Sequence, residues 1–180
     1  MISMYNKLKI WFVIIIIAVL LVGYLMLNTR VSKLEGKLQA IEGITSLEMY
    51  ESIEKFSDSF KVPRYVAYNV AYQETGYRGP LHLNYDHKKT SFAGAVGPMQ
   101  IIPRYAHHFA GRRVTEKELR ENVQLNVYLS MKMLRYWYNI HRDWTLACGA
   151  YNSGKPIRND YALYAAANKD YKNKWIKSVE

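Results

Sequence analysis

The chain has 180 residues and a net charge of +10, from 25 Lys and Arg against 15 Asp and Glu. This charge favours an anionic partner or reflects general solubility, and the lack of a helix-turn-helix, zinc-finger or RNP pattern argues against nucleic acid. The single cysteine (Cys148) excludes an intrachain disulfide, and five histidines at no metal-ligand spacing predict no metal site.

Residues 10–27 form an uncharged apolar stretch near the N-terminus. The segment IWFVIIIIAVLLVGYLML holds 18 residues, with Lys7 and Lys9 before it and Arg30 after it. This length is enough to span a hydrocarbon core of about 30 Å. A cleavable signal peptide is the alternative, but the segment ends in bulky residues instead of a small-residue cleavage site. We expect residues 1–30 to be a retained single-pass membrane anchor, whose orientation the flanking cations leave open.

Residues 31–44 carry a short heptad-like pattern. Apolar residues spaced by 3, 4 and 3 are typical of a helical stalk or a weak coiled coil, and here they are Val31, Leu34, Leu38 and Ile41. Gly36 and Gly43 interrupt the pattern, so a partner helix stays open. We therefore predict a helical stalk or linker over residues 31–44 and one domain over residues 45–180, with the boundary near Gly43.

The domain is predicted to be mainly α, because no run of alternating β-branched residues is present. We expect one helix over about 46–56, a turn at 57–59, and a second helix that begins near Pro63 and ends at Gly76. A short helix is predicted from about Pro103. The longest predicted helix covers about 115–139, opens with a Thr115–Glu118 capping box, and turns one apolar row inward: Leu119, Val123, Val127, Met131 and Leu134. A last helix is expected from Asp143 or Trp144 to about Ser153.

One carboxylate stands out in the stretch YVAYNVAYQETGYRGP, residues 65–80. Glu74 falls at the end of a helix that the apolar pattern predicts to be buried, and Tyr68, Tyr72 and Tyr77 are close in sequence. Burial raises the pKa of a carboxyl group, which is what a general acid needs at neutral pH. We therefore take Glu74 as a candidate acid and expect the three tyrosine rings near it, although ordinary helix packing is the alternative for these rings.

Two further motifs follow in the chain. SFAGAVGPMQIIP, residues 91–103, combines small residues that permit a tight backbone path with Gln100, whose amide both donates and accepts hydrogen bonds. ACGAYNSGKP, residues 147–156, allows close helix packing and presents Tyr151 and Asn152 at a helix end.

In this order the three motifs resemble those of the lytic transglycosylases, the soluble-lytic-transglycosylase branch of the lysozyme superfamily. That family carries a Glu followed by Ser or Thr at a helix end, then a Ser before a Gly-Leu-Met-Gln-Ile-like segment, then Ala-Tyr-Asn-x-Gly. The matching positions here are Glu74 with Thr75, Ser91 with residues 94–101, and residues 150–154. The resemblance covers residues from about 50 to 160, and it departs from the family in a longer spacing between Glu74 and Ser91.

The resemblance implies a lysozyme-like helical domain that cleaves the β-1,4 bond between N-acetylmuramic acid and N-acetylglucosamine in peptidoglycan. It implies that Glu74 acts first as the acid and then as the base, and that a 1,6-anhydromuramoyl end forms without a metal or cofactor. The resemblance also implies substrate-binding roles for Ser91, Met99, Gln100, Tyr151 and Asn152, with Met99 as the floor of the cleft.

Two other functions stay open at this point. A hydrolytic lysozyme would need a second carboxylate to activate water, and Asp86 in the longer spacing after Glu74 is the candidate. A wall-binding assembly protein without activity would need neither residue. The expected partners are glycan strands and, through residues 10–27, a membrane, with the catalytic domain facing the wall. A bacteriophage virion, an envelope-spanning secretion or conjugation assembly, and ordinary wall remodelling are equally compatible with the sequence.

Overall fold

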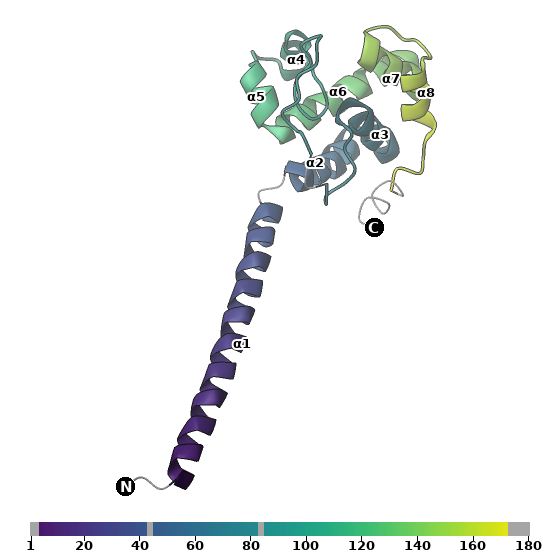
Figure 1. Cartoon of the computed structure of the whole chain (residues 1–180). Helices are drawn as coiled ribbons and strands as arrows, with labels where there is room; N and C mark the ends of the chain where they lie inside the picture. The colour runs from purple at the N-terminus through teal and green to yellow at the C-terminus, as the bar shows by residue number, and fades with distance from the viewer. Residues whose placement is uncertain (1–3, 43–44, 83–84, 173–180) are drawn as a thin grey trace. The chain divides into compact units, whose positions relative to one another are not determined.

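The computed structural model describes residues 4–42, 45–82 and 85–172, and contacts divide the chain into the units Met1–Gly43 and Ile44–Glu180. The predicted boundary at Gly43 lies outside the described residues. The helices are labelled in Figure 1.

The first unit is one helix, α1 (Met4–Glu42), whose backbone continues past Gly23 and Gly36 without a break. Its segment Trp11–Lys33 is long and apolar enough to cross a membrane by length and composition, and its side chains are exposed. The predicted stalk is therefore helical up to Glu42. The predicted coiled-coil positions Leu34, Leu38 and Ile41 have side chains outside the described part.

The second unit is helical, which confirms the predicted class. It consists of α2 (Thr45–Phe60), α3 (Arg64–Thr75), α4 (Pro103–Ala110), α5 (Glu116–Glu121), α6 (Val123–His141), α7 (Trp144–Ser153) and α8 (Asp160–Ala167). Within the described residues the only β pairing is two isolated bridges, Thr90 with Val96 and Val96 with Ile101. In Figure 1, α4 and α5 lie on one side of this unit, α7 and α8 lie on the other, and α6 runs between them.

Helix α6 carries the centre of the core. The predicted inward row is confirmed, because all five of its side chains are fully buried: Leu119, Val123, Val127, Met131 and Leu134. Most of the row packs with α2 and α3, whereas Leu119 belongs to a second apolar cluster that includes Val96, Ile101 and Phe109. The two clusters meet along α6, so this helix links the α3 side of the domain to the α4 side.

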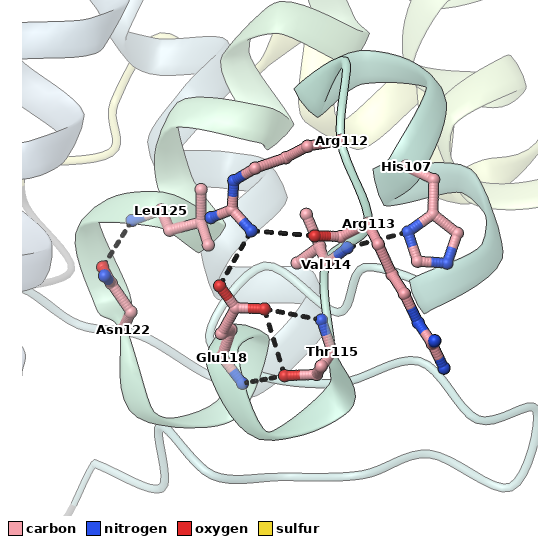
Figure 2. Close-up of polar contacts among 8 residues, drawn as sticks. All are labelled: His107, Arg112, Arg113, Val114, Thr115, Glu118, Asn122 and Leu125. Atoms are coloured by element: carbon pink, nitrogen blue, oxygen red, sulfur yellow. Dashed lines mark hydrogen bonds and ion pairs between the residues drawn. The ribbon is translucent and has the colours of Figure 1, made fainter.

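The single long helix predicted over 115–139 was wrong, because the structure has two helices there. The Thr115–Glu118 capping box opens α5 as predicted, but Asn122 leaves the helical conformation and accepts a hydrogen bond from Leu125 N at 2.8 Å, which starts α6. Figure 2 shows this corner, where Arg112 also pairs with Glu118. The helical spacing of the buried apolar residues continues from α5 into α6, which is why the sequence pattern suggested one helix.

Two other helix predictions need correction. The turn expected at Ser57–Ser59 is instead the last part of α2, where the buried Ser57 hydroxyl lies 3.7 Å from Met131 Sδ. Helix α8 was not predicted; its N-terminus is capped by Asn159, whose side chain accepts a hydrogen bond from Ala162 N. The predicted start of α4 and the predicted bounds of α3 and α7 agree with the structure, including Gly76 in the left-handed conformation after α3.

The loop over residues 91–101, which carries the second motif, is held by the buried side-chain amide of Asn126 on α6. Asn126 on α6 accepts a hydrogen bond from Met99 N at 3.0 Å and donates to Val96 O and Leu119 O at 2.9 Å each. A buried amide with three partners makes each of those backbone positions costly to move. The loop over residues 91–101 is therefore fixed relative to α6.

Candidate active site

A cavity of about 700 Å³ opens between the helices of the second unit, and its volume is that of a typical ligand site. The lining side chains come from the end of α3, the 91–102 loop, α4, α6 and the end of α7. They are Glu74, Ser91, Ala93, Ala95, Gln100, Ile101, Ile102, Arg104, Tyr105, His108, Phe109, Met133, Tyr136, Trp137, Ala150, Tyr151, Asn152, Ser153 and Gly154. Sequence elements that are far apart therefore share one cavity.

Glu74 is the one carboxyl-bearing residue among the lining residues of the described chain. It lies in the last turn of α3, partly buried, and its Oε1 accepts a 2.6 Å hydrogen bond from the Tyr161 hydroxyl. Burial raises the pKa of Glu74 to about 7, against the opposing effects of the Tyr161 hydrogen bond and of the nearby Lys89 charge. At neutral pH this group exists in both protonated and ionised forms, so it can give and take a proton.

The end of α3 is fastened to the loop that faces it. Lys89 Nζ donates to the main-chain oxygen of Glu74 at 2.8 Å, and Thr75 Oγ1 donates to Pro98 O at 2.8 Å. The Thr75 hydroxyl also lies 2.9 Å from the hydroxyl of buried Tyr85. These contacts fix the backbone that carries Glu74 relative to residues 89–98.

The tyrosines expected around Glu74 lie elsewhere. Tyr68 and Tyr77 are buried in the core, where their hydroxyls donate to Glu54 Oε1 and to Ser46 O, and the ring of Tyr72 stacks on Tyr164. The hydroxyl group that donates a hydrogen bond to Glu74 belongs to Tyr161 of α8. The Asn159 cap before an alanine-rich segment is the signal that would have indicated α8, but no local pattern joins it to Glu74.

Ser91 and Gln100 line the cavity and bind the loop backbone. Ser91 Oγ accepts from Ala95 N at 3.0 Å, which closes the turn through residues 91–95. The Gln100 amide donates to Lys89 O and Gly97 O at 2.9 and 2.8 Å, while its backbone adopts a positive φ of 52°. The donor end of the Gln100 side chain is therefore occupied by the protein.

Tyr151 joins the second and third motifs. Its hydroxyl donates to Met99 O at 2.6 Å and lies 3.0 Å from Ser130 Oγ, and burial raises the pKa of Tyr151 above its usual range. The Met99 side chain is fully buried and is not among the lining residues. Asn152 is exposed at the cavity, where its Oδ1 accepts from Asn159 Nδ2 at 3.3 Å.

Asp86, the candidate second carboxylate, is exposed in the loop after α3. Its Oδ1 accepts from Lys88 N at 3.0 Å, which is a local turn contact. Asp86 is not among the residues that line the cavity. Of the residues that the sequence singled out, the structure brings together Glu74, Ser91, Gln100, Tyr151 and Asn152 at the cavity. It leaves Asp86 outside, and Met99, expected as the floor of the cleft, is buried behind the lining residues.

Comparison with solved structures gives the same fold at low sequence identity. The 70-kDa soluble lytic transglycosylase from Escherichia coli matches with a TM-score of 0.50 and 18% identity over 69% of this chain and 22% of its own. A complex of the 70-kDa soluble lytic transglycosylase with bulgecin A gives a TM-score of 0.54 and 18% identity over 72% of this chain and 24% of that one. An inactive Glu-to-Gln mutant of the lytic transglycosylase Slt from Pseudomonas aeruginosa gives 0.51 and 15% over 72% and 24%.

The chain therefore spans about a quarter of the length of these solved proteins. A comparison with curated protein sequences gave no significant match. A protein-family comparison matches the Transglycosylase SLT domain to residues 51–174, which include Glu74, the 91–103 loop, Tyr151 and Tyr161. Because this match covers more than half of the chain, the protein belongs to the Transglycosylase SLT domain family.

Proposed function

We propose that the chain is a lytic transglycosylase that cleaves the β-1,4 bond between N-acetylmuramic acid and N-acetylglucosamine in peptidoglycan. The observation that carries this proposal is Glu74, a lining carboxyl group whose pKa of about 7 fits it for both halves of a proton transfer. Family membership and the fold of the solved lytic transglycosylases support it further.

In the first step, protonated Glu74 gives its proton to the glycosidic oxygen while the bond from that oxygen to the muramoyl C1 breaks. Positive charge develops at the sugar ring, and the acid becomes a carboxylate beside it. The Tyr161 hydroxyl, 2.6 Å from Oε1, then stabilises the new negative charge by a hydrogen bond.

In the second step, the muramoyl 6-hydroxyl attacks C1 and gives its proton to the Glu74 carboxylate. The new C1–O6 bond closes the 1,6-anhydro ring and restores the protonated acid, so no water is consumed. One carboxyl group is enough for this sequence because the substrate supplies the nucleophile. Ser91, Gln100 and Tyr151 hold the loop that faces the sugar, and Asn152 is exposed to the sugar at the end of α7.

A hydrolytic lysozyme would require a second carboxylate to activate water. Asp86 is the sequence candidate, but it is exposed, makes a turn contact with Lys88 and is not a lining residue. This placement favours transglycosylation over hydrolysis. An assembly protein without activity would have no use for a buried acid held by Tyr161.

We also propose that α1 anchors the enzyme in a membrane with the second unit on the side of the cell wall. The apolar segment Trp11–Lys33 supports the anchor, and a wall substrate requires an extracytoplasmic domain. Carbonate extraction of membranes and mass measurement of the mature chain test this proposal. Release by carbonate, or loss of the first 25 to 35 residues, would contradict it.

The catalytic proposal is tested with Glu74→Gln on purified peptidoglycan, because glutamine keeps the shape but carries no acidic proton. We expect activity to fall by about 10²- to 10⁴-fold with the fold intact. Mass spectrometry of the wild-type products should show anhydromuramoyl ends. Two exposed carboxylates serve as matched controls, Glu51 on α2 and Asp86 in the loop after α3. Glu51→Gln and Asp86→Asn should keep full activity. Reducing ends together with an inactive Asp86→Asn variant would favour the lysozyme.

A further inference from the structure

Part of the cavity is lined by residues of α4 and α6 whose hydrogen bonds and ring contacts, within the described chain, involve groups other than Glu74: Arg104, Tyr105, His108, Phe109, Tyr136 and Trp137. We call this set the α4–α6 wall. The acid itself is fixed from α8 by Tyr161 and from the loop by Lys89. Neither of these two hydrogen bonds comes from the α4–α6 wall.

Aromatic rings make the α4–α6 wall continuous. The ring of Phe109 lies 5.4 Å from that of Tyr136, and Tyr136 lies 5.1 Å from Trp137, both nearly edge-on. Tyr136 is 42% exposed and Tyr105 is 47% exposed, so ring surface is open to a ligand. Such faces bind apolar faces of sugars and peptide groups, while the ring polar edges stay solvated.

Arg104 adds a positive charge to this surface. Its guanidinium lies 4.8 Å from the Tyr105 ring centroid, and Nη2 donates to the Tyr105 hydroxyl at 3.1 Å. Among the described residues, Arg64, Arg112, Arg120 and Arg158 pair with acids, whereas Arg104 makes no ion pair. Stacking orients the guanidinium plane, and its remaining N–H groups fit a carboxylate in the bidentate geometry.

We propose that Arg104 and the α4–α6 wall bind a carboxylate carried by the muramoyl part of the substrate. This inference rests on the proposed function, because it takes the ligand to be a peptidoglycan strand. Two sources supply that carboxylate: the lactyl group of a muramoyl unit without its peptide, and the acidic residues of an attached stem peptide. In either case the enzyme prefers strands that carry the negative charge over strands that do not.

The charge balance of the cavity supports an anionic ligand. Within the described chain, Arg104 is the lining residue with a permanent charge, and burial raises the pKa of the single lining carboxyl group, that of Glu74, which disfavours its negative form. An added carboxylate therefore meets one cation and no fixed negative charge there. Its pairing with Arg104 in a partly exposed cavity is worth a moderate gain in affinity, about tenfold.

The experiment measures binding of soluble strands to the full chain in detergent, on the Glu74→Gln background so that nothing is cleaved. Four strand preparations serve as probes: strands with stem peptides, strands stripped by an amidase, and each of these two after carbodiimide amidation of its carboxyl groups. Arg104→Met is compared with Arg104→Lys and with Arg113→Met. Arg113 is an exposed arginine outside the cavity, whose side chain extends away from the contacts drawn in Figure 2.

We expect Arg104→Met to weaken binding of carboxylate-bearing strands about tenfold and to leave amidated strands unchanged. Arg104→Lys should recover part of the loss, and Arg113→Met should bind as the parent does. A loss restricted to stripped strands assigns the lactyl carboxylate, and a loss restricted to peptide-bearing strands assigns the stem. An equal loss on amidated strands, or no loss on any strand, overturns the proposal.

Failure of the proposed function gives a different result. Wild-type chain that leaves all strands uncut, or that yields only reducing ends, contradicts the transglycosylase. The comparison of strand binding with and without Arg104→Met stays valid in both cases, because it is measured on the Glu74→Gln background, which does not cleave the strands. Equal unfolding temperatures of the parent and Arg104→Met exclude a loss of fold as the cause of weaker binding.

Discussion

Helices α3 and α7 end in the same way, yet their last turns serve different purposes. Each stops at a glycine in the left-handed conformation, Gly76 with φ 71° and Gly154 with φ 73°, and each carries a lining residue just before that glycine. Glu74 of α3 is partly buried and held by Tyr161, whereas Asn152 of α7 is exposed. The shared ending aims side chains into the cavity, and the surroundings decide what each one can do.

The difference has a chemical reason. A proton donor needs a raised pKa, which requires desolvation, so the end of α3 is covered by Tyr161 and by the loop of Lys89. A group that only contacts a ligand must stay open until the ligand arrives. Changes near α3 should therefore alter kcat and the pH profile, and changes near α7 should alter KM.

The largest expected effect among these tests comes from Tyr161→Phe. Loss of the 2.6 Å hydrogen bond removes the donor that stabilises the Glu74 carboxylate, and we expect kcat to fall about 10- to 100-fold. Since the hydrogen bond lowers the pKa of Glu74, its loss raises that pKa, and the basic limb of the pH profile moves upward. Tyr164→Phe on the same helix is the matched control. An unchanged pH profile would remove Tyr161 from the proton transfer.

Asn152→Ala tests the other side of the comparison. The exposed amide at the end of α7 lines the cavity, so we expect KM to rise up to about tenfold with kcat nearly unchanged. Asn139→Ala, at an exposed position on α6, should behave as the parent does. A fall in kcat with constant KM would show that the end of α7 takes part in the chemical step.

Replacing either glycine by alanine puts both helix ends under the same strain. A Cβ added at either glycine would meet no other atom, so the cost comes from the positive φ alone. We expect each variant to lose about 1 kcal/mol of unfolding free energy. Chemical denaturation measures this loss. The functional effects should separate, with kcat reduced in Gly76→Ala and KM raised in Gly154→Ala. The same kinetic change in both variants would contradict the division between the two ends.

Lys89→Met should have the smallest effect and should act on pH dependence. The Lys89 charge lowers the pKa of Glu74, so its removal raises that pKa and keeps the acid protonated to higher pH. We expect the basic limb of kcat/KM to move upward by less than about 1 pH unit, because the ammonium is exposed to solvent. Lys88→Met controls for surface charge. A downward shift would mean that Lys89 acts through something other than its charge.

The parts of the site that the sequence predicted depend on short segments. Glu74 with Gly76, the 91–103 loop and residues 150–154 each carry their signal within a few residues, and the structure brings all three to one cavity. The helical class and the buried row of α6 also follow from local period. Such features are predictable because the residues that determine them are neighbours in sequence.

Features that depend on distant partners were not predictable in the same way. Tyr161 reaches Glu74 across 87 positions, from a short helix without an apolar stripe strong enough to reveal it. Asn122 breaks the long predicted helix because its side chain caps α6, and the apolar spacing of Leu119 and Val123 does not indicate this break. The positions of Tyr68 and Tyr77 likewise depend on α2, because their hydroxyls donate hydrogen bonds to Glu54 and Ser46 of that helix.

The unbroken length of α1 has a consequence for where the enzyme can work. A helix of 39 residues is about 58 Å long, and a bilayer core takes up about 30 Å of it. If residues 10–27 of α1 span the hydrocarbon core, the 15 residues after them, 28–42, form a helical spacer of up to about 22 Å on the C-terminal side. The spacer would set a working height, so that the glycan layers within reach are selected by distance from the membrane as well as by chemistry.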